Sequence, residues 1–130
     1  MADLTHGDLE LLHGKNFAHV ATIGPGCSPH VTVTWVDEAD GFVLVDTAAG
    51  RVKDRNVLRD PRVTVSVFDQ TDPYRWLMVR GSVEERVVGD EAERFINVLS
   101  RKYTDEPWEY QPGQIRVLYR IRPERIARSG

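Results

Sequence analysis

The chain has 130 residues, which is enough for one domain and too few for two of ordinary size. Its 41% hydrophobic and 28% charged residues exclude a disordered tail, a collagen-like repeat and a disulfide scaffold. The net charge of −3 gives no sign of the basic surface of a nucleic-acid-binding domain, and it does not favour membrane binding. We therefore expect one globular domain over residues 1–130, without a nucleic-acid or membrane partner.

The first third of the chain predicts a short helix followed by two strands. Residues 5–12 are expected to be helical, because Thr5 can cap the first turn and Asp8 follows three residues later. Residues 17–23 are apolar on both faces, which is typical of a fully buried strand. In residues 30–36, valine and tryptophan alternate with histidine and threonine, which predicts a strand with one apolar and one small polar face.

The same alternation predicts further strands at 63–68, 77–84 and 115–122, and a short apolar run predicts another at 42–46. Helices are expected at 51–59 and 90–103, with a loop at 104–114. Turn-forming residues occur at 24–29, 38–41 and 69–73, and the second of these turns should join strands 30–36 and 42–46 as a hairpin.

Together these elements predict a mainly β protein. Six or more short, mostly antiparallel strands with peripheral helices indicate one barrel. Strands this short and joined by hairpins exclude a doubly wound parallel sheet.

The segment 46–56 carries the clearest functional signal. A strand ends, small residues turn, and a helix begins, so that free backbone N–H groups and the positive end of the helix dipole point outward. Arg51, Lys53 and Arg55 add three cations, which suit a phosphate or another small anion. The alternative is a solvated basic helix face balanced by nearby aspartates. We expect neither Lys53 nor Arg55 in the core, because the apolar residues of this helix are at 57–58.

A second candidate is the aromatic and cationic sequence Tyr74-Arg75-Trp76 at the start of a strand. Such residues stack on a planar ligand or fill a subunit interface. The alternative is simple core packing of Trp76.

Other site types find little support in the sequence. The four histidines and Cys27 lack metal-ligand spacing, so no metal site is expected. The lone cysteine and the absence of a signal peptide favour a free thiol in the reducing cytoplasm. No nucleophile elbow or Ser/His/Asp set is present, so an enzymatic activity would need a bound cofactor.

Several motifs, taken in order and spacing, resemble the flavin and deazaflavin oxidoreductases of the pyridoxamine 5′-phosphate oxidase-like superfamily. Within it, the chain resembles the small actinobacterial group that uses the deazaflavin coenzyme F420. The motifs extend over nearly the whole chain, at 17–22, 26–31, 35, 47–56, 60–63, 72–76, 79–81 and 122–126.

This resemblance implies a split β-barrel that forms a homodimer, with two cofactors in grooves between the subunits. It implies that Lys53 and Arg55, with Asn56 beside them, hold the cofactor phosphate, next to the Arg51 of the anion site. The ring would be lined by Thr32, Val33, Thr34, Trp35 and Thr47. The partner subunit would contribute Trp76, Leu77, Met78, Val79 and Arg80.

The resemblance further implies a reductase, in which the reduced deazaflavin gives a hydride to an unsaturated acceptor such as an enone, a quinone or a tetrapyrrole-like system. FMN also carries a phosphate, so the basic site does not distinguish the two cofactors. The subgroup and the arginine-rich composition, 14 of 17 basic residues, favour the deazaflavin. The alternatives are an FMN-dependent oxidoreductase, a non-catalytic cofactor carrier, or a haem-binding barrel with His19 or His30 as axial ligand. Vitamin B6 oxidation is disfavoured, because a second arginine-rich substrate motif is absent, and no acid or base residue is assigned.

Overall fold

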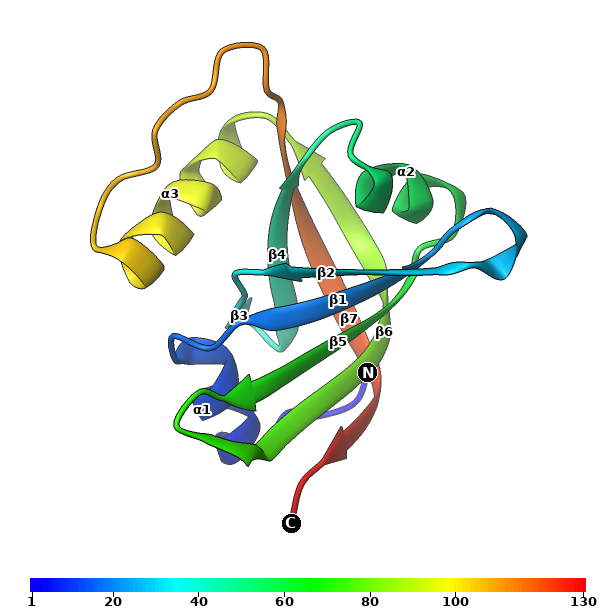
Figure 1. Cartoon of the computed structure of the whole chain (residues 1–130), viewed down its shortest axis with the longest axis vertical. Helices are drawn as coiled ribbons and strands as arrows, with labels where there is room; N and C mark the ends of the chain where they lie inside the picture. Colours follow the sequence, from blue (N-terminus) through cyan, green and yellow to red (C-terminus); the bar gives the residue numbers. More distant parts are fainter.

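A computed structural model describes residues 1–130 and shows one antiparallel sheet of seven strands curled into a barrel, with helices at its periphery (Figure 1). The strands are β1 (Ala18–Ile23), β2 (Pro29–Thr34), β3 (Asp37–Ala39), β4 (Phe42–Ala48), β5 (Arg62–Asp69), β6 (Asp72–Val88) and β7 (Arg116–Arg128). The helices are α1 (His6–His13), α2 (Val52–Arg59) and α3 (Asp90–Thr104), with a 3-10 turn at Pro25–Cys27. None of the helices is long and apolar enough to span a bilayer.

The sheet has the strand order β2-β1-β5-β6-β7-β4-β3, so β2 and β3 are its two edges. The long strands β6 and β7 pair with each other along most of their length and form the centre of the sheet. Gly81 lies at a register shift between them, where a Cβ atom would come within 2.0 Å of the Arg122 carbonyl oxygen. Only glycine allows this close approach of the two strands.

Alternating residues of the strands fill the interior of the barrel. Leu77 and Val79 of β6 and Tyr119 and Ile121 of β7 are fully buried in one cluster of 16 core residues. Helix α1 adds leucines to the same cluster, and α2 adds Val57. Burial of this apolar surface is the main term that stabilises the fold.

The expected start of the first helix is confirmed. The Asp8 backbone N–H donates to Thr5 Oγ1 at 3.2 Å, and the Thr5 N–H donates to Asp8 Oδ2 at 2.9 Å, which is a reciprocal capping box. The predicted helices at 51–59 and 90–103 agree with α2 and α3 to within a residue at each end.

The expected hairpin between strands 30–36 and 42–46 is wrong. The turn at Asp40–Gly41 joins β4 to the short β3, which the alternation did not reveal, while β2 pairs with β1 at the other edge of the sheet. Only Trp35 and Val36 separate β2 from β3, and Val36 is fully buried. Local turn chemistry thus predicted a hairpin correctly but not its partner strands.

Two burial expectations also need correction or completion. Strand β1 is fully buried on one face only, because His19, Ala21 and Ile23 on the other face are half-buried. Strand β2 alternates as predicted, but its apolar face points outward: Val31 is 57% and Val33 59% exposed.

Candidate functional site

The first turn of α2, at one end of the barrel (Figure 1), is anchored to the core by Asp54. The Tyr119 hydroxyl donates to Asp54 Oδ1 at 2.6 Å, and Arg86 donates to both carboxylate oxygens at 2.9 and 2.7 Å. Burial would raise the pKa of Asp54, but the hydrogen bonds from Arg86 and Tyr119 outweigh it and hold the pKa below its usual value. The position of α2 relative to the sheet is therefore fixed.

Asn56 provides a second anchor for the same helix. Its side-chain amide donates to Thr22 Oγ1 of β1 at 3.0 Å, and its carbonyl oxygen accepts from Arg59. Asn56 is fully buried and both ends of its amide are used. In this structure it holds the helix against the sheet.

Lys53 lies between these anchors and is only 6% exposed. The expectation that it lies outside the core is therefore wrong, because the anchored helix presses its first turn onto the barrel. The ammonium group forms no hydrogen bond or ion pair with the chain. Burial lowers the pKa of Lys53 to about 8, and the positive charges of Arg51 and Arg116 add to the effect. Lys53 Nζ is not among the fully enclosed atoms without a partner, so the ammonium group reaches the surface, and there it and the neighbouring cations form a favourable place for an anion to bind.

The other cations of this segment are exposed. Arg51 is the N-cap residue of α2, and Arg55 donates to the Gly50 carbonyl oxygen at 3.3 Å. Leu58, assigned with Val57 to the apolar side of the helix, is 62% exposed, so only Val57 packs into the core. Arg55 thus lies at the surface, as predicted, and is free to reorient toward a ligand.

Two threonines of the predicted ring site have buried hydroxyl groups without any partner. They are Thr32 of β2 and Thr47 of β4. Buried hydroxyls nearly always form hydrogen bonds, so each of these two is an exception that a polar group from outside the chain would satisfy. Hydroxyl groups and an unpaired ammonium group are the kinds of partner that a ligand with an anionic group and polar ring atoms uses.

Three predicted ring residues, Val33, Thr34 and Trp35, come together with Arg51 at one cavity of about 300 Å³. We call it the Trp35–Trp108 pocket, defined by Phe17, Val33, Thr34, Trp35, Asp46, Arg51, Ile96, Leu99, Trp108 and Arg116. Trp35 stacks on Tyr103 with ring centroids 5.4 Å apart and meets Trp108 edge-on at 6.2 Å. The pocket therefore has aromatic walls that pack against one another.

Sequence reasoning missed six residues of this pocket, namely Phe17, Asp46, Ile96, Leu99, Trp108 and Arg116. Arg116 Nε donates to Asp46 Oδ1 at 3.0 Å, and both side chains are almost completely buried. Burial raises the pKa of Asp46 to about 7 against the opposing charge of Arg116. The one sequence signal for this part of the pocket was Asp46 itself, a carboxylate at the end of the apolar run 42–46.

The predicted partner-subunit segment 76–80 alternates between the core and the surface. Leu77 and Val79 are fully buried in the barrel, so only their backbones can meet a ligand. Trp76, Met78 and Arg80 face outward. The structure does not bring this outer face to the Trp35–Trp108 pocket within one chain.

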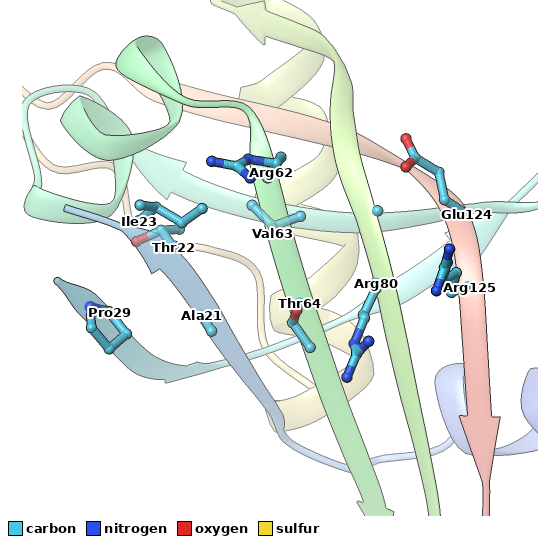
Figure 2. A pocket seen from close by; sticks show the side chains of 11 residues that line it. Ala21, Thr22, Ile23, Pro29, Arg62, Val63, Thr64, Arg80, Glu124 and Arg125 are labelled. Atoms are coloured by element: carbon cyan, nitrogen blue, oxygen red, sulfur yellow. The ribbon is translucent and has the colours of Figure 1, made fainter. Parts of the chain in front are cut away.

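Arg80 lines an open groove of about 390 Å³ on the outside of the barrel (Figure 2). Arg62 of β5 and Arg125 of β7 line the same groove. Arg80 and Arg125 are direct cross-strand partners in the sheet. Glu124 lines the groove as well, so the groove is cationic on balance.

Comparisons with known proteins agree on one family. A model of the family described as pyridoxamine 5′-phosphate oxidase matches residues 5–129. A solved structure described as an F420 reductase is 32% identical, with a TM-score of 0.84, over 95% of this chain and 98% of that chain. No curated protein matches the chain.

More distant structures share the fold. The conserved protein Rv2991 from Mycobacterium tuberculosis is 24% identical with a TM-score of 0.73, over 99% of this chain and 88% of that chain. The General Stress Protein 26 from Bacillus anthracis is 19% identical with a TM-score of 0.67, over 92% and 88%. The predicted split β-barrel is thereby confirmed.

Proposed function

Because this chain belongs to the pyridoxamine 5′-phosphate oxidase family, we propose that it is an oxidoreductase whose cofactor is the deazaflavin coenzyme F420. In this proposal, it transfers a hydride between the deazaflavin and an unsaturated small molecule. Family membership supports an oxidoreductase of the F420 or flavin type. That the cofactor is F420 rather than a flavin is our proposal.

The observation that carries the proposal is the buried, unpaired Lys53. Burying a charge without a counter-ion is costly, and protein side chains usually supply one. Here none does, and the neighbouring charges are positive. A cofactor phosphate would supply the missing charge, with Arg51 and Arg55 at its exposed side.

The ring of the cofactor would meet the inner end of β2 and β4. The unpartnered hydroxyls of Thr32 and Thr47 can bond to its polar atoms. Val33, Thr34 and Trp35 supply a wall and exclude water. The bound coenzyme supplies the hydride chemistry, and the chain orients it and keeps the reacting face dry.

The choice of F420 over FMN is supported by the F420 reductase that shares 32% of its residues with this chain. The phosphate site alone suits both cofactors. FMN therefore remains the alternative against which the cofactor is tested.

A homodimer is part of the proposal. The edge strand β2 exposes Val31 and Val33, and Trp76 is 38% exposed on the outer face of β6. Soluble chains seldom leave such apolar faces open, and a second copy of the barrel would cover them. The partner would then supply Trp76, Met78 and Arg80 to the cofactor groove.

The reaction is tested by mixing the purified protein with reduced coenzyme F420 and menadione, a planar quinone. The return of coenzyme fluorescence reports oxidation of the coenzyme. We expect this oxidation to be faster with the protein than without it. Absence of any protein-dependent rate with a series of quinones and enones, while the cofactor binds, would reduce the chain to a cofactor carrier.

A further inference from the structure

The segment 105–115 joins the end of α3 to the start of β7 and is the orange arch in Figure 1. It contains no helix or strand, and all of its residues except Trp108 and Gln114 are exposed. Gln114 lies next to the start of β7, where its Oε1 accepts from Arg116. Trp108 is therefore the one residue in the middle of this segment that is withdrawn from solvent.

The hydrogen bonds of the segment hold its middle at one point. Backbone hydrogen bonds tie its ends, Asp105 and Ile115, to the body of the chain. From 107 to 113, a single hydrogen bond reaches the body, in which the Trp108 N–H donates to Asn97 Oδ1 of α3 at 3.0 Å. The other hydrogen bonds of this stretch stay within the segment. A segment with so few contacts to the body opens locally at a small cost in free energy.

The Trp108 ring closes one side of the Trp35–Trp108 pocket. It meets Trp35 edge-on at 6.2 Å and lies under the Arg116 guanidinium at 5.0 Å. Contacts of these two kinds are individually weak, so they hold the ring in place without locking it. Val33 and Thr34 line the same pocket and, with Trp35, are assigned to the cofactor ring. Movement of Trp108 would therefore open or close the ring site from this side.

Both ends of the segment have backbone conformations that suit a hinge. Asp105 ends α3 in the left-handed region, with φ of 63°, so the helix does not continue through it. Gly113 has φ of 80°, and glycine changes between positive and negative φ with little steric cost. Residues 106–112 can therefore move together while α3 and β7 stay in place.

We propose that the segment 105–115 is a lid over the Trp35–Trp108 pocket, latched by the Trp108 ring and its hydrogen bond to Asn97, and that the cofactor enters and leaves when the lid is open. The inference rests on the proposed function for the identity of the ligand. The latch itself is a property of the free chain. Asn97 does not line the pocket, so it is a positioning residue that acts through Trp108.

The latch is tested first without any ligand, by amide hydrogen exchange of the full chain. Asn97→Ala removes the acceptor of the Trp108 N–H, and residues 106–110 should exchange about two- to tenfold faster, the range of one neutral hydrogen bond. Exchange in β6 and β7 should stay unchanged. Asn97→Asp keeps an acceptor at this position and should exchange at the wild-type rate. An unchanged exchange rate of residues 106–110 in Asn97→Ala would overturn the latch.

The matched control is Gln111→Ala. The Gln111 side chain donates only to the Glu109 carbonyl oxygen, at the exposed tip of the same segment. Its removal touches neither the Trp108 ring nor Asn97, so exchange at 106–108 should keep the wild-type rate. Equal acceleration in Gln111→Ala and Asn97→Ala would show that no specific latch exists.

The lid is tested next by the kinetics of binding of oxidised coenzyme F420, followed by its fluorescence after rapid mixing. A lid that must open multiplies the association and dissociation rate constants by the same open fraction. Asn97→Ala should therefore raise both rate constants by the same factor, about two- to tenfold, and leave Kd within about twofold. Asn97→Asp and Gln111→Ala should bind at wild-type rates. A segment that only forms a wall of the site would change the dissociation rate constant alone.

The two experiments separate the possible failures. If the dissociation rate constant alone changes in Asn97→Ala, or neither rate constant changes, the lid is refuted while the proposed function stands. If neither coenzyme F420 nor FMN binds to the wild type, the proposed function fails, and the exchange rates of the free chain decide whether the latch stands.

Discussion

Lys53 and Asp54 are neighbours in α2 and both are buried, yet only Asp54 has partners. The carboxylate holds the helix in place through Tyr119 and Arg86, and the ammonium group is left for a ligand. The adjacent charges facing Lys53, those of Arg51 and Arg116, are positive. At the residue scale, the site therefore pairs a carboxylate whose charge is compensated within the chain, Asp54, with a neighbouring ammonium group whose charge is not, Lys53.

This arrangement predicts opposite pH effects on binding and on stability. As pH rises through about 8, folded Lys53 loses its proton and cofactor affinity should fall. The unfolded chain keeps that proton up to the ordinary lysine pKa of about 10.5, so it binds more protons than the folded chain in this window. The contribution of Lys53 to the free energy of unfolding should therefore rise with pH between about 8 and 10.5.

The measurement is cofactor affinity and urea unfolding at several pH values, for the wild type and Lys53→Met. The difference between the two proteins isolates this group. Parallel pH curves for both proteins would show that Lys53 does not titrate as described.

At the scale of elements, α2 is the part that carries the anion site, and its hold on the barrel is local and testable. Tyr119→Phe removes the 2.6 Å hydrogen bond to buried Asp54 while keeping the ring in the core. We expect a loss of about 1–2 kcal/mol in the free energy of unfolding, because a buried carboxylate loses one donor. Cofactor affinity should fall several-fold as the helix loosens.

The control is Tyr110→Phe: Tyr110 is 64% exposed, so this change should alter neither quantity. Chemical denaturation and a cofactor titration report both effects. A stability loss in Tyr119→Phe with unaltered affinity would separate the anchor from the site.

Much of this element arrangement could be predicted from the sequence, because the signals are local. The Thr5 capping box, the alternation of the strands and the small residues before α2 each involve neighbours in the chain. Which strands pair, and which face of β2 points outward, could not be predicted, since alternation gives a period and no direction. The pocket was missed because its residues are distant in the sequence: Asp46 and Arg116 are 70 residues apart.

The burial of Lys53 was missed because it depends on anchors outside its helix. Tyr119 and Arg86 come from β7 and β6, and Thr22 comes from β1. From the local sequence alone, a lysine with an arginine two residues away on each side is expected on a solvent-exposed helix face.

At the scale of the whole molecule, the outward-facing apolar side of the edge strand β2 predicts a dimer. The wild type should sediment at twice the 14.8 kDa of one chain. Val31→Lys should shift it toward the monomer, because a charge would replace an apolar side chain inside the interface, and cofactor affinity should fall with it. Val98→Lys is a matched control, since Val98 is 52% exposed on α3. A wild-type monomer that binds cofactor at full strength would refute the shared site.

The most direct test of the whole account is a titration of oxidised coenzyme F420 and of FMN into the wild type and Lys53→Met, with a thermal melt of each protein. We predict tighter binding of F420 than of FMN to the wild type. Lys53→Met should weaken both by about ten- to a hundredfold, since a charged hydrogen bond to phosphate is lost. It should also leave the melting temperature equal or higher, because a buried unpaired charge is removed. Unchanged affinity in a folded Lys53→Met protein, or no binding of either cofactor to the wild type, would contradict the account.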